Sequence, residues 1–268
     1  MKHIVKNLHN GTVNIALVGV GGTGSLVLSG LVRLNHALRQ LGHPGIEVEV
    51  YDPDIVTEAN IGRQLFTPDE VGRNKAECLI DRYNLGFALN WTAHKEKYER
   101  WIFQHYHILI SCVDSKASRR EIAAKFSGTT GTYVIDSGND GNFGQILIGN
   151  GSKDLPFPYK VHPDLIKGKE THHAPSCSLA EALTRQDLFI NQWMATAILQ
   201  LLWQMFRHGE LTYRGFYINL ETGRMNPVPI GNTIYRTATA GAATAPALTS
   251  RTSSNQAGRA QHERDALM

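Results

Sequence analysis

The stretch "VNIALVGVGGTGS", residues 13–25, decides the fold class of this chain. Its first six residues are largely apolar, which is typical of a buried strand. Glycines follow in the pattern GxGxxG, formed by Gly19, Gly21 and Gly24, with Gly22 as an additional glycine. An apolar helical pattern then continues to about residue 38. A strand, a glycine-rich turn and a helix in this order are typical of a nucleotide-binding α/β unit.

Each glycine of this turn is expected for a different physical reason. The first permits a tight turn, the second lets the main chain approach a ligand, and the third lets the helix pack close to the strand. The start of the helix then offers unpaired N–H groups and a partial positive charge to an anion. The turn therefore predicts a nucleotide site, while glycines that serve packing alone stay the alternative.

Strand and helix patterns alternate through the first half of the chain. Strands are predicted at 46–51, 107–113, 132–138 and 143–149, and helices at 73–84, 95–104 and 116–127. The last two strands are expected to pair through a turn at residues 139–142. This alternation predicts an α/β fold with a Rossmann-like, mostly parallel sheet and helices on both faces.

The second half changes character. Residues 150–177 are predicted to form an irregular loop, followed by a long helix at about 179–207 and a last strand at 215–220. We expect one domain over residues 1–235, with the nucleotide-binding part at about 12–150 and the loop, long helix and last strand at 151–235. Residues 236–268 are rich in Ala, Thr and Ser with little apolar periodicity, which predicts a disordered tail.

Composition excludes several classes of protein. The 268 residues carry a formal net charge of only +3, which does not favour nucleic acid binding. The sequence contains no uninterrupted apolar run long enough for a membrane-spanning helix. The first residues lack the apolar core and cleavage site of a signal peptide, so we expect a cytoplasmic protein.

The chain has three cysteines, Cys78, Cys112 and Cys177, and no CxxC pair, so no zinc site is expected. Cys78 and Cys112 fall in a predicted helix and strand, and we expect both in the core. Three histidines, His162, His172 and His173, match no standard metal spacing and are expected in a solvated loop.

Acidic and cationic side chains follow the predicted strands. The stretch "YDPDIVTEANIGRQLF", residues 51–66, places Asp52 and Asp54 at the end of one strand, and Asp114 follows the next. Ligands bind at the carboxyl ends of strands in open α/β sheets. Acids there suit a ribose, and Asp114 suits Mg²⁺. Phosphates would be held by the polar and cationic residues that come after the second strand, namely Asn60, Arg63, Gln64 and Lys75.

This set of groups favours ATP chemistry over a nicotinamide enzyme, which needs a hydride-transfer site. An NAD-binding Rossmann oxidoreductase nevertheless stays an alternative, because the glycine pattern is common to both.

Four motifs in order resemble the ThiF/MoeB/E1 superfamily of ubiquitin-activating-like adenylating enzymes. They are "GVGGTG" (19–24), "DPDIVTEANIGRQ" (52–64), "VGRNKA" (71–76) and "CVDSKASRR" (112–120). The resemblance is strong over residues 12–145 and weaker over 175–202. Within the superfamily, the chain is most similar to the ThiF-family protein of PRTRC gene clusters.

The resemblance implies a role for each matching residue. Asp52, with Asp54 beside it, would bind the ribose, Asp114 would hold Mg²⁺, and Arg119 matches a recurrent arginine of open role. The nucleotide turn would consist of Gly19, Gly21, Gly22 and Gly24, and the phosphates would be bound by Asn60, Arg63, Gln64 and Lys75. The catalytic residues implied are Arg63, Lys75, Asp114 and Cys177.

The reaction implied is ATP-dependent adenylation of the C-terminal carboxylate of a small ubiquitin-like β-grasp protein. Cys177 would either take the activated carboxylate as a thioester or fill a loop-to-helix junction. A homodimer, an E2-like protein and a JAB-type metalloprotease belong to the same implied context. A non-catalytic scaffold that binds a ubiquitin-like protein is a further alternative.

Overall fold

The computed structural model describes residues 1–61, 64–99, 105–168 and 186–231. All of these fall within one unit, residues 1–236. The predicted disordered tail at 236–268 lies outside the described residues, so it and the domain boundary stay predictions.

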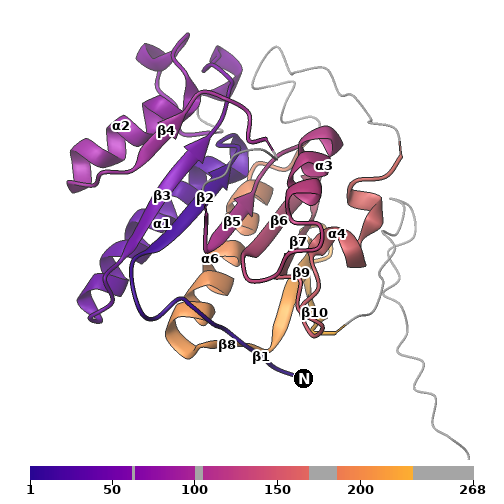
Figure 1. Cartoon of the computed structure of the whole chain (residues 1–268). Coiled ribbons are helices and arrows are strands. Elements are labelled where there is room, and N and C mark those ends of the chain that lie inside the picture. The colour runs from indigo at the N-terminus through magenta and orange to yellow at the C-terminus, as the bar shows by residue number, and fades with distance from the viewer. Residues whose placement is uncertain (62–63, 100–104, 169–185, 232–268) are drawn as a thin grey trace, which may run out of the picture. The chain divides into compact units, whose positions relative to one another are not determined.

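The described residues form an eight-stranded sheet in the order β10-β9-β7-β6-β5-β2-β3-β4 (Figure 1). The strands β6, β5, β2, β3 and β4 run parallel, and β7, β9 and β10 continue the sheet as antiparallel strands. The bounds are β2 (Val13–Val18), β3 (Ile46–Tyr51), β4 (Thr92–His94), β5 (Ile108–Ser111), β6 (Tyr133–Asp140), β7 (Phe143–Gly149), β9 (Tyr213–Asn219) and β10 (Arg224–Pro229). The predicted Rossmann-like sheet is therefore confirmed.

The central strand β2 is buried on both faces. Ile15 lies opposite Val48 of β3 on one side and opposite Ile108 of β5 on the other. Near-continuous apolar strands of this kind need a layer of helices on each face to exclude water. The sequence meets this requirement with helices that follow the parallel strands.

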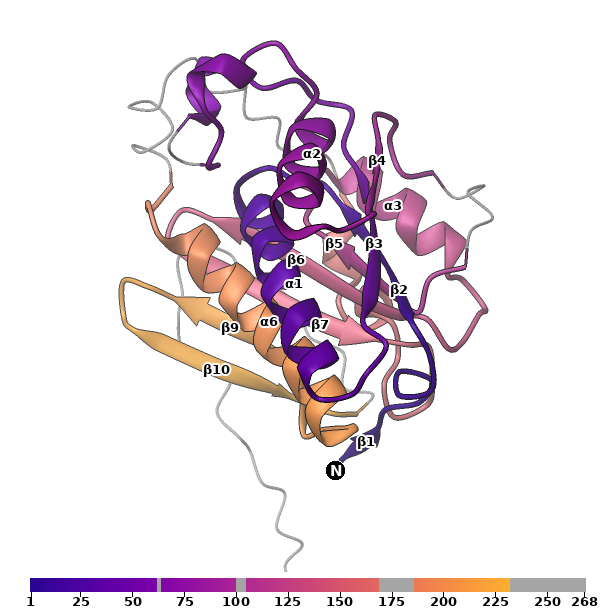
Figure 2. The same cartoon turned by 90° about the vertical axis from the view of Figure 1, so that its left-hand side faces the viewer.

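One face of the sheet is covered by α1 (Gly22–Gln40), α2 (Lys75–Phe87) and α6 (Ile190–His208). Figure 2 shows α1 and α6 running side by side across it. The opposite face is covered by α3 (Lys116–Lys125) and the short α4 (Pro158–Val161), around a second apolar cluster. Both cores are closed by helices that begin at the carboxyl ends of β2 and β5.

Short elements complete the described chain. β1 (His3–Ile4) pairs with β8 (Glu210–Leu211) in a separate two-stranded sheet. Three 3₁₀ turns occur in the described segments: η1 (Glu58–Asn60), η2 (Pro68–Glu70) and η3 (Pro163–Leu165). No helix of the described residues is long and apolar enough to span a bilayer.

Two predicted helices differ from the structure. The helix expected at 95–104 is wrong over 95–99, which is not helical, because Tyr98 is buried and packs edge-on against Tyr51. The long helix expected at about 179–207 runs from Ile190 to His208 and does not include residues 186–189, while residues 179–185 lie outside the described residues. Asp187 makes non-helical hydrogen bonds just before the helix, and these account for its later start. The N–H of Asp187 donates to the Gly141 carbonyl, and its carboxylate accepts the N–H of Phe189.

Other differences concern short or edge elements. β10 contains Pro227 and Pro229 and lies at an edge of the sheet, where proline is tolerated but gives no strand signal. The strand predicted at 107–113 is shorter, and the described part of the predicted loop contains α4 and η3.

His162 was expected in a solvated loop, and this prediction is wrong. Only 1% of the residue is exposed, and its Nε2 lies 2.6 Å from the hydroxyl of Tyr217. Burial first, and then the positive charge of Arg214, lower the pKa of His162 from 6.5 to about 4, while Asp164 opposes the shift. His172 and His173 lie outside the described residues.

The lowered pKa predicts a pH dependence of stability. Between pH 6.5 and 4 the unfolded chain binds more protons at His162 than the native state does. The free energy of unfolding therefore decreases as the pH is lowered from 6.5 to 4. The loss attributable to His162 is up to about 3 kcal/mol. His162→Gln should remove that part of the slope in urea unfolding series at several pH values. The exposed His208→Gln should keep the wild-type slope; a His162→Gln slope equal to wild type would contradict the assignment.

Candidate functional site

The candidate site lies at the carboxyl ends of β2, β3 and β5, which are neighbours in the sheet. The glycine turn follows β2, Asp52 follows β3, and Asp114 follows β5. Topology thus brings together residues that are far apart in the sequence.

Packing accounts for three glycines of the turn. Gly19 has a φ of +84°, and a Cβ there would lie 2.9 Å from the carbonyl oxygen of Cys112. A Cβ on Gly22 would lie 2.6 Å from Nδ2 of Asn191. A Cβ on Gly24 would overlap the carbonyl oxygen of Gly19. Gly19 and Gly24 require glycine whether or not a ligand binds, because a Cβ there meets main chain, whereas at Gly22 the Asn191 side chain would have to move.

Gly21 is different. A Cβ on Gly21 would meet no described atom within 4 Å, and the residue is the N-cap of α1 without a side-chain cap. The first turn of α1 contains no acidic residue, so the N–H groups and partial positive charge of the helix start are available to an anion. Space beside a helix N-terminus fits the phosphates of a nucleotide.

Asp52 joins the end of β3 to the glycine turn. Its Oδ2 accepts the N–H of Val20 at 2.7 Å, and its Oδ1 accepts the N–H of Asp54 at 2.9 Å. Burial raises the pKa of Asp52, while these N–H groups and the charge of Lys75 oppose the shift. Each carboxylate oxygen has a second lone pair, so Asp52 has acceptor capacity left for a ribose hydroxyl.

Lys75 is the first residue of α2 and points its ammonium group back to β3. Its Nζ lies 3.1 Å from Oδ2 of Asp54, with the lysine side chain 9% exposed and the aspartate 66% exposed. Asn74 caps α2 and donates to the carbonyls of Asp52 and Asp54. A bridge to such an exposed carboxylate is weak, so a phosphate could replace Asp54 at little cost.

The other residues predicted to bind phosphates have mixed surroundings. Asn60 is buried, and its Oδ1 accepts from the N–H and hydroxyl of Thr57, which is a capping role. Gln64 is buried, and its Oε1 has no hydrogen-bond partner in the described structure. An unpaired buried carbonyl oxygen suits a hydrogen-bond donor, such as a hydroxyl group of a ligand. Arg63 lies outside the described residues.

Asp114 is exposed two residues beyond Cys112, between β5 and α3. Ser115 caps α3 by accepting the N–H of Ser118, so the aspartate is not used as the cap. Mg²⁺ bound with a nucleotide typically takes one or two carboxylates, with phosphate and water oxygens completing its shell. A single exposed carboxylate fits that kind of site.

Arg119 is buried behind Asp114 rather than exposed to a ligand. Its Nε lies 3.2 Å from Oδ2 of Asp136. Burial has the largest single effect and opposes the charge of the guanidinium, but the charge and hydrogen bond of Asp136, together with Tyr159 and Asp114, raise the pKa of Arg119. The two other cations at the start of α3 bind main-chain carbonyls: Lys116 donates to Lys167 and Arg120 to Ile166.

Asn191 is a site residue that sequence reasoning missed. Its Oδ1 accepts the hydroxyl of Thr23 at 3.0 Å, and its side chain fills the space beside Gly22. Asn139 also donates to the same oxygen at 3.4 Å. The start of α6 therefore packs directly on the nucleotide turn. Asn191 lies in the weaker stretch of resemblance, so its sequence carried no separate signal.

The cysteines divide into three cases. Cys78 is buried in α2, as predicted. Cys112 lies just beyond the end of β5, is half-buried, and its main chain packs on Gly19. Burial raises the pKa of the Cys112 thiol well above its usual range, which disfavours the nucleophilic thiolate. Cys177 lies outside the described residues.

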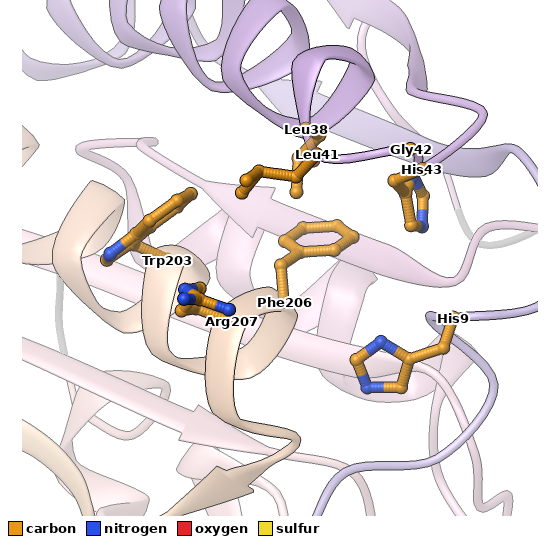
Figure 3. Close-up of a pocket in the computed structure, with 8 residues that line it drawn as sticks. All are labelled: His9, Leu38, Leu41, Gly42, His43, Trp203, Phe206 and Arg207. Carbon is orange, nitrogen blue, oxygen red and sulfur yellow. The ribbon is translucent and has the colours of Figure 1, made fainter.

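A separate pocket of about 240 Å³ lies between the C-terminal ends of α1 and α6 (Figure 3). His43 lines the pocket, and its Nε2 is hydrogen-bonded to the carbonyl oxygen of Leu8. The ring of Phe206 packs edge-on against the ring of His43. The pocket lies at the end of α1 opposite the glycine turn, so it is distinct from the candidate site.

Comparisons with known proteins agree with this architecture. The sequence model described as "ThiF family" matches residues 5–234. A SUMO-activating enzyme subunit, uba-2 from Caenorhabditis elegans, is 26% identical over 141 residues, which are 50% of this chain and 22% of that subunit.

Solved structures share the fold. E. coli MccB with MccA-N7isoASN has a TM-score of 0.58 at 14% identity, covering 84% of this chain and 66% of that chain. E. coli MccB with ATP gives 0.58 at 15%, covering 84% and 65%. PaaA gives 0.56 at 18%, covering 81% and 64%. The chain thus spans about a fifth of the curated relative and just under two thirds of the solved ones.

The packing of the turn predicts different results for two glycines. Gly24→Ala should lower the free energy of unfolding by roughly 2–4 kcal/mol, because the methyl group overlaps main chain. Gly21→Ala should lower it by only about 1 kcal/mol, the usual cost of alanine at an N-cap, because the space beside Gly21 is open. Urea unfolding of both variants measures the difference, and equal destabilisation would contradict the described turn.

Proposed function

Because the chain belongs to the ThiF family, we propose that it is an ATP-dependent adenylyltransferase. Its proposed substrate is the C-terminal carboxylate of a small ubiquitin-like β-grasp protein. The observation that carries the proposal is the arrangement at the carboxyl end of the parallel strands: open space beside Gly21 after β2, Lys75 at the start of α2, and Asp114 after β5.

The relatives support ATP as the nucleotide and a peptide or small protein as the other substrate. MccB has been solved with ATP and with MccA, and uba-2 is a subunit of a SUMO-activating enzyme. The family match favours adenylation over an NAD-dependent oxidoreductase. Lys75 and Asp114 favour an enzyme over a non-catalytic scaffold, which needs neither group.

The proposed binding follows from the described side chains. The start of α1 and Gly21 face the phosphates, Asp52 accepts the ribose hydroxyls, and Lys75 leaves Asp54 for a phosphate oxygen. Asn60, Gln64 and Arg63 are proposed to complete the phosphate site. Gln64 would bind a phosphate oxygen through its amide Nε2, which is a donor.

In the proposed reaction, a carboxylate oxygen of the substrate attacks the α-phosphorus of ATP. A P–O bond forms there, the bond to the β-phosphate oxygen breaks, and pyrophosphate leaves. Asp114 would hold Mg²⁺, which when bound supplies positive charge against the phosphates. Lys75 and Arg63 add fixed positive charge where negative charge develops on the leaving group. Positioning lowers the barrier further, because both reactants are held in line.

Later steps are part of the proposal as well. We propose that Cys177 takes the activated carboxylate as a thioester with release of AMP. In the alternative, Cys177 has a structural role and forms no thioester. Cys177→Ala separates these possibilities, because it should abolish a thiol-sensitive conjugate while adenylation continues.

The wider context rests on the resemblance to PRTRC proteins. In this proposal the chain forms a homodimer and acts with an E2-like protein and a JAB-type metalloprotease in the cytoplasm, where ATP is supplied. Size measurement in solution tests the homodimer.

The roles of Lys75 and Asp114 predict the kinetics of two variants. In ATP–pyrophosphate exchange with magnesium and β-grasp proteins that end in glycine, Lys75→Ala and Asp114→Ala should each lower the rate by about 100-fold or more. The exposed Lys153→Ala, at the other end of the sheet, should exchange as wild type. Thermal unfolding checks that the variants fold. Wild-type exchange by both folded variants would overturn the proposed roles.

A further inference from the structure

A buried ion pair lies directly behind the exposed Asp114. Arg119 of α3 and Asp136 of β6 are both buried, with Nε and Oδ2 3.2 Å apart. The hydroxyl of Tyr159, from α4, donates to the same Oδ2 at 2.9 Å. Three elements therefore meet at one carboxylate oxygen.

The guanidinium of Arg119 extends this pair to the main chain of the site. Its Nη1 donates to the carbonyl of Asp114 at 3.4 Å, and its Nη2 donates to the carbonyl of Ser137 at 3.1 Å. Gly138 leaves room for the guanidinium, because a Cβ there would lie 2.8 Å from Nη2. The main chain of Asp114, whose carboxylate is exposed, is thus hydrogen-bonded to the buried guanidinium of Arg119.

Stability alone is a poor reason for this pair. Burying two charges costs desolvation, and apolar side chains of similar size often stabilise a core as well or better. What an ion pair adds is a defined geometry with directional hydrogen bonds. Here that geometry ends on the main chain of Asp114.

Two further hydrogen bonds join α3 to the segment that contains Tyr159. Lys116 donates to the carbonyl of Lys167 at 2.9 Å, and Arg120 donates to the carbonyl of Ile166 at 3.2 Å. Residues 158–168 and α3 are therefore held against each other beside the Asp114 loop. Arg119 links both of them to the main chain of Asp114.

We propose that Asp136 and Tyr159 are positioning residues for Asp114, which they hold through Arg119 so that its carboxylate meets magnesium bound with the nucleotide. Neither residue belongs to the motifs that point to the reaction. The inference rests on the proposed function, because it takes Asp114 as the magnesium ligand. Outer partners of metal ligands orient them, and their loss typically weakens metal binding by about 10- to 100-fold.

Calorimetric titration of the full chain with ATP, once in EDTA and once with excess magnesium, tests the proposal. The quantity compared is the gain in ATP affinity that magnesium brings. Asp136→Asn and Tyr159→Phe should each reduce this gain by about tenfold, with ATP affinity in EDTA within about twofold of wild type. Asp114→Ala sets the reference for a complete loss of the gain.

Two further variants keep the test decisive. Tyr159→Phe removes only a hydroxyl, so it remains informative if Asp136→Asn leaves Arg119 unpaired and fails to fold. Asp154→Asn is the control, because it disrupts a part-buried hydrogen bond with His3, whose ring also contacts the hydroxyl of Tyr133 at the amino end of β6. It should lower the melting temperature and keep the full magnesium gain.

Distinct results overturn distinct claims. A full magnesium gain in both Asp136→Asn and Tyr159→Phe, or equal weakening with and without magnesium, would show a merely structural role. Wild type that binds ATP in neither condition would overturn the proposed function itself. A wild type that shows the gain, with both variants losing it, supports both.

Discussion

The close approach between the end of β2 and the first turn of α1 is the constraint on which the rest of this structure depends. A single methyl group on Gly24 would overlap the carbonyl oxygen of Gly19. Gly19 packs against the main chain of Cys112, which follows β5. The N–H of Val20 donates to the carboxylate of Asp52, which follows β3. Through these contacts the turn, three strand ends and the start of α1 form one rigid frame. That frame leaves the space beside Gly21 open.

Charge is arranged around this frame in a way that suits a polyphosphate. The start of α1 and the ammonium of Lys75 supply positive charge, and Asp54 is an exposed and therefore weak counter-ion for Lys75. Asp114 stands after the neighbouring strand, supported by the buried Arg119–Asp136 pair. Fixed charges of this kind need no rearrangement when a reaction develops negative charge. The same edge of the sheet thus combines a rigid turn with charges that are ready for a ligand.

Sequence reasoning succeeds where a signal is local. β3 and β7 have the predicted bounds, because β3 alternates apolar residues with glutamates and β7 contains a short apolar run, and both patterns are typical of strands. Asp52, Lys75 and Asp114 could be gathered at one edge because parallel strands bring their carboxyl ends together. The helix predicted at 95–104 fails over its described part, because the charged residues surround a buried Tyr98 that packs on Tyr51. Asn191, Asp136 and Tyr159 escape prediction because only tertiary packing brings α6, β6 and α4 to the site.

The measurement that tests the central claim most directly is a pair of calorimetric titrations of the full chain, one with ATP and magnesium and one with NAD. We expect saturable binding of ATP and no saturable binding of NAD, because the charges beside the glycine turn suit a triphosphate with its metal. Saturable binding of NAD without binding of ATP would contradict it, and the turn would then belong to an oxidoreductase.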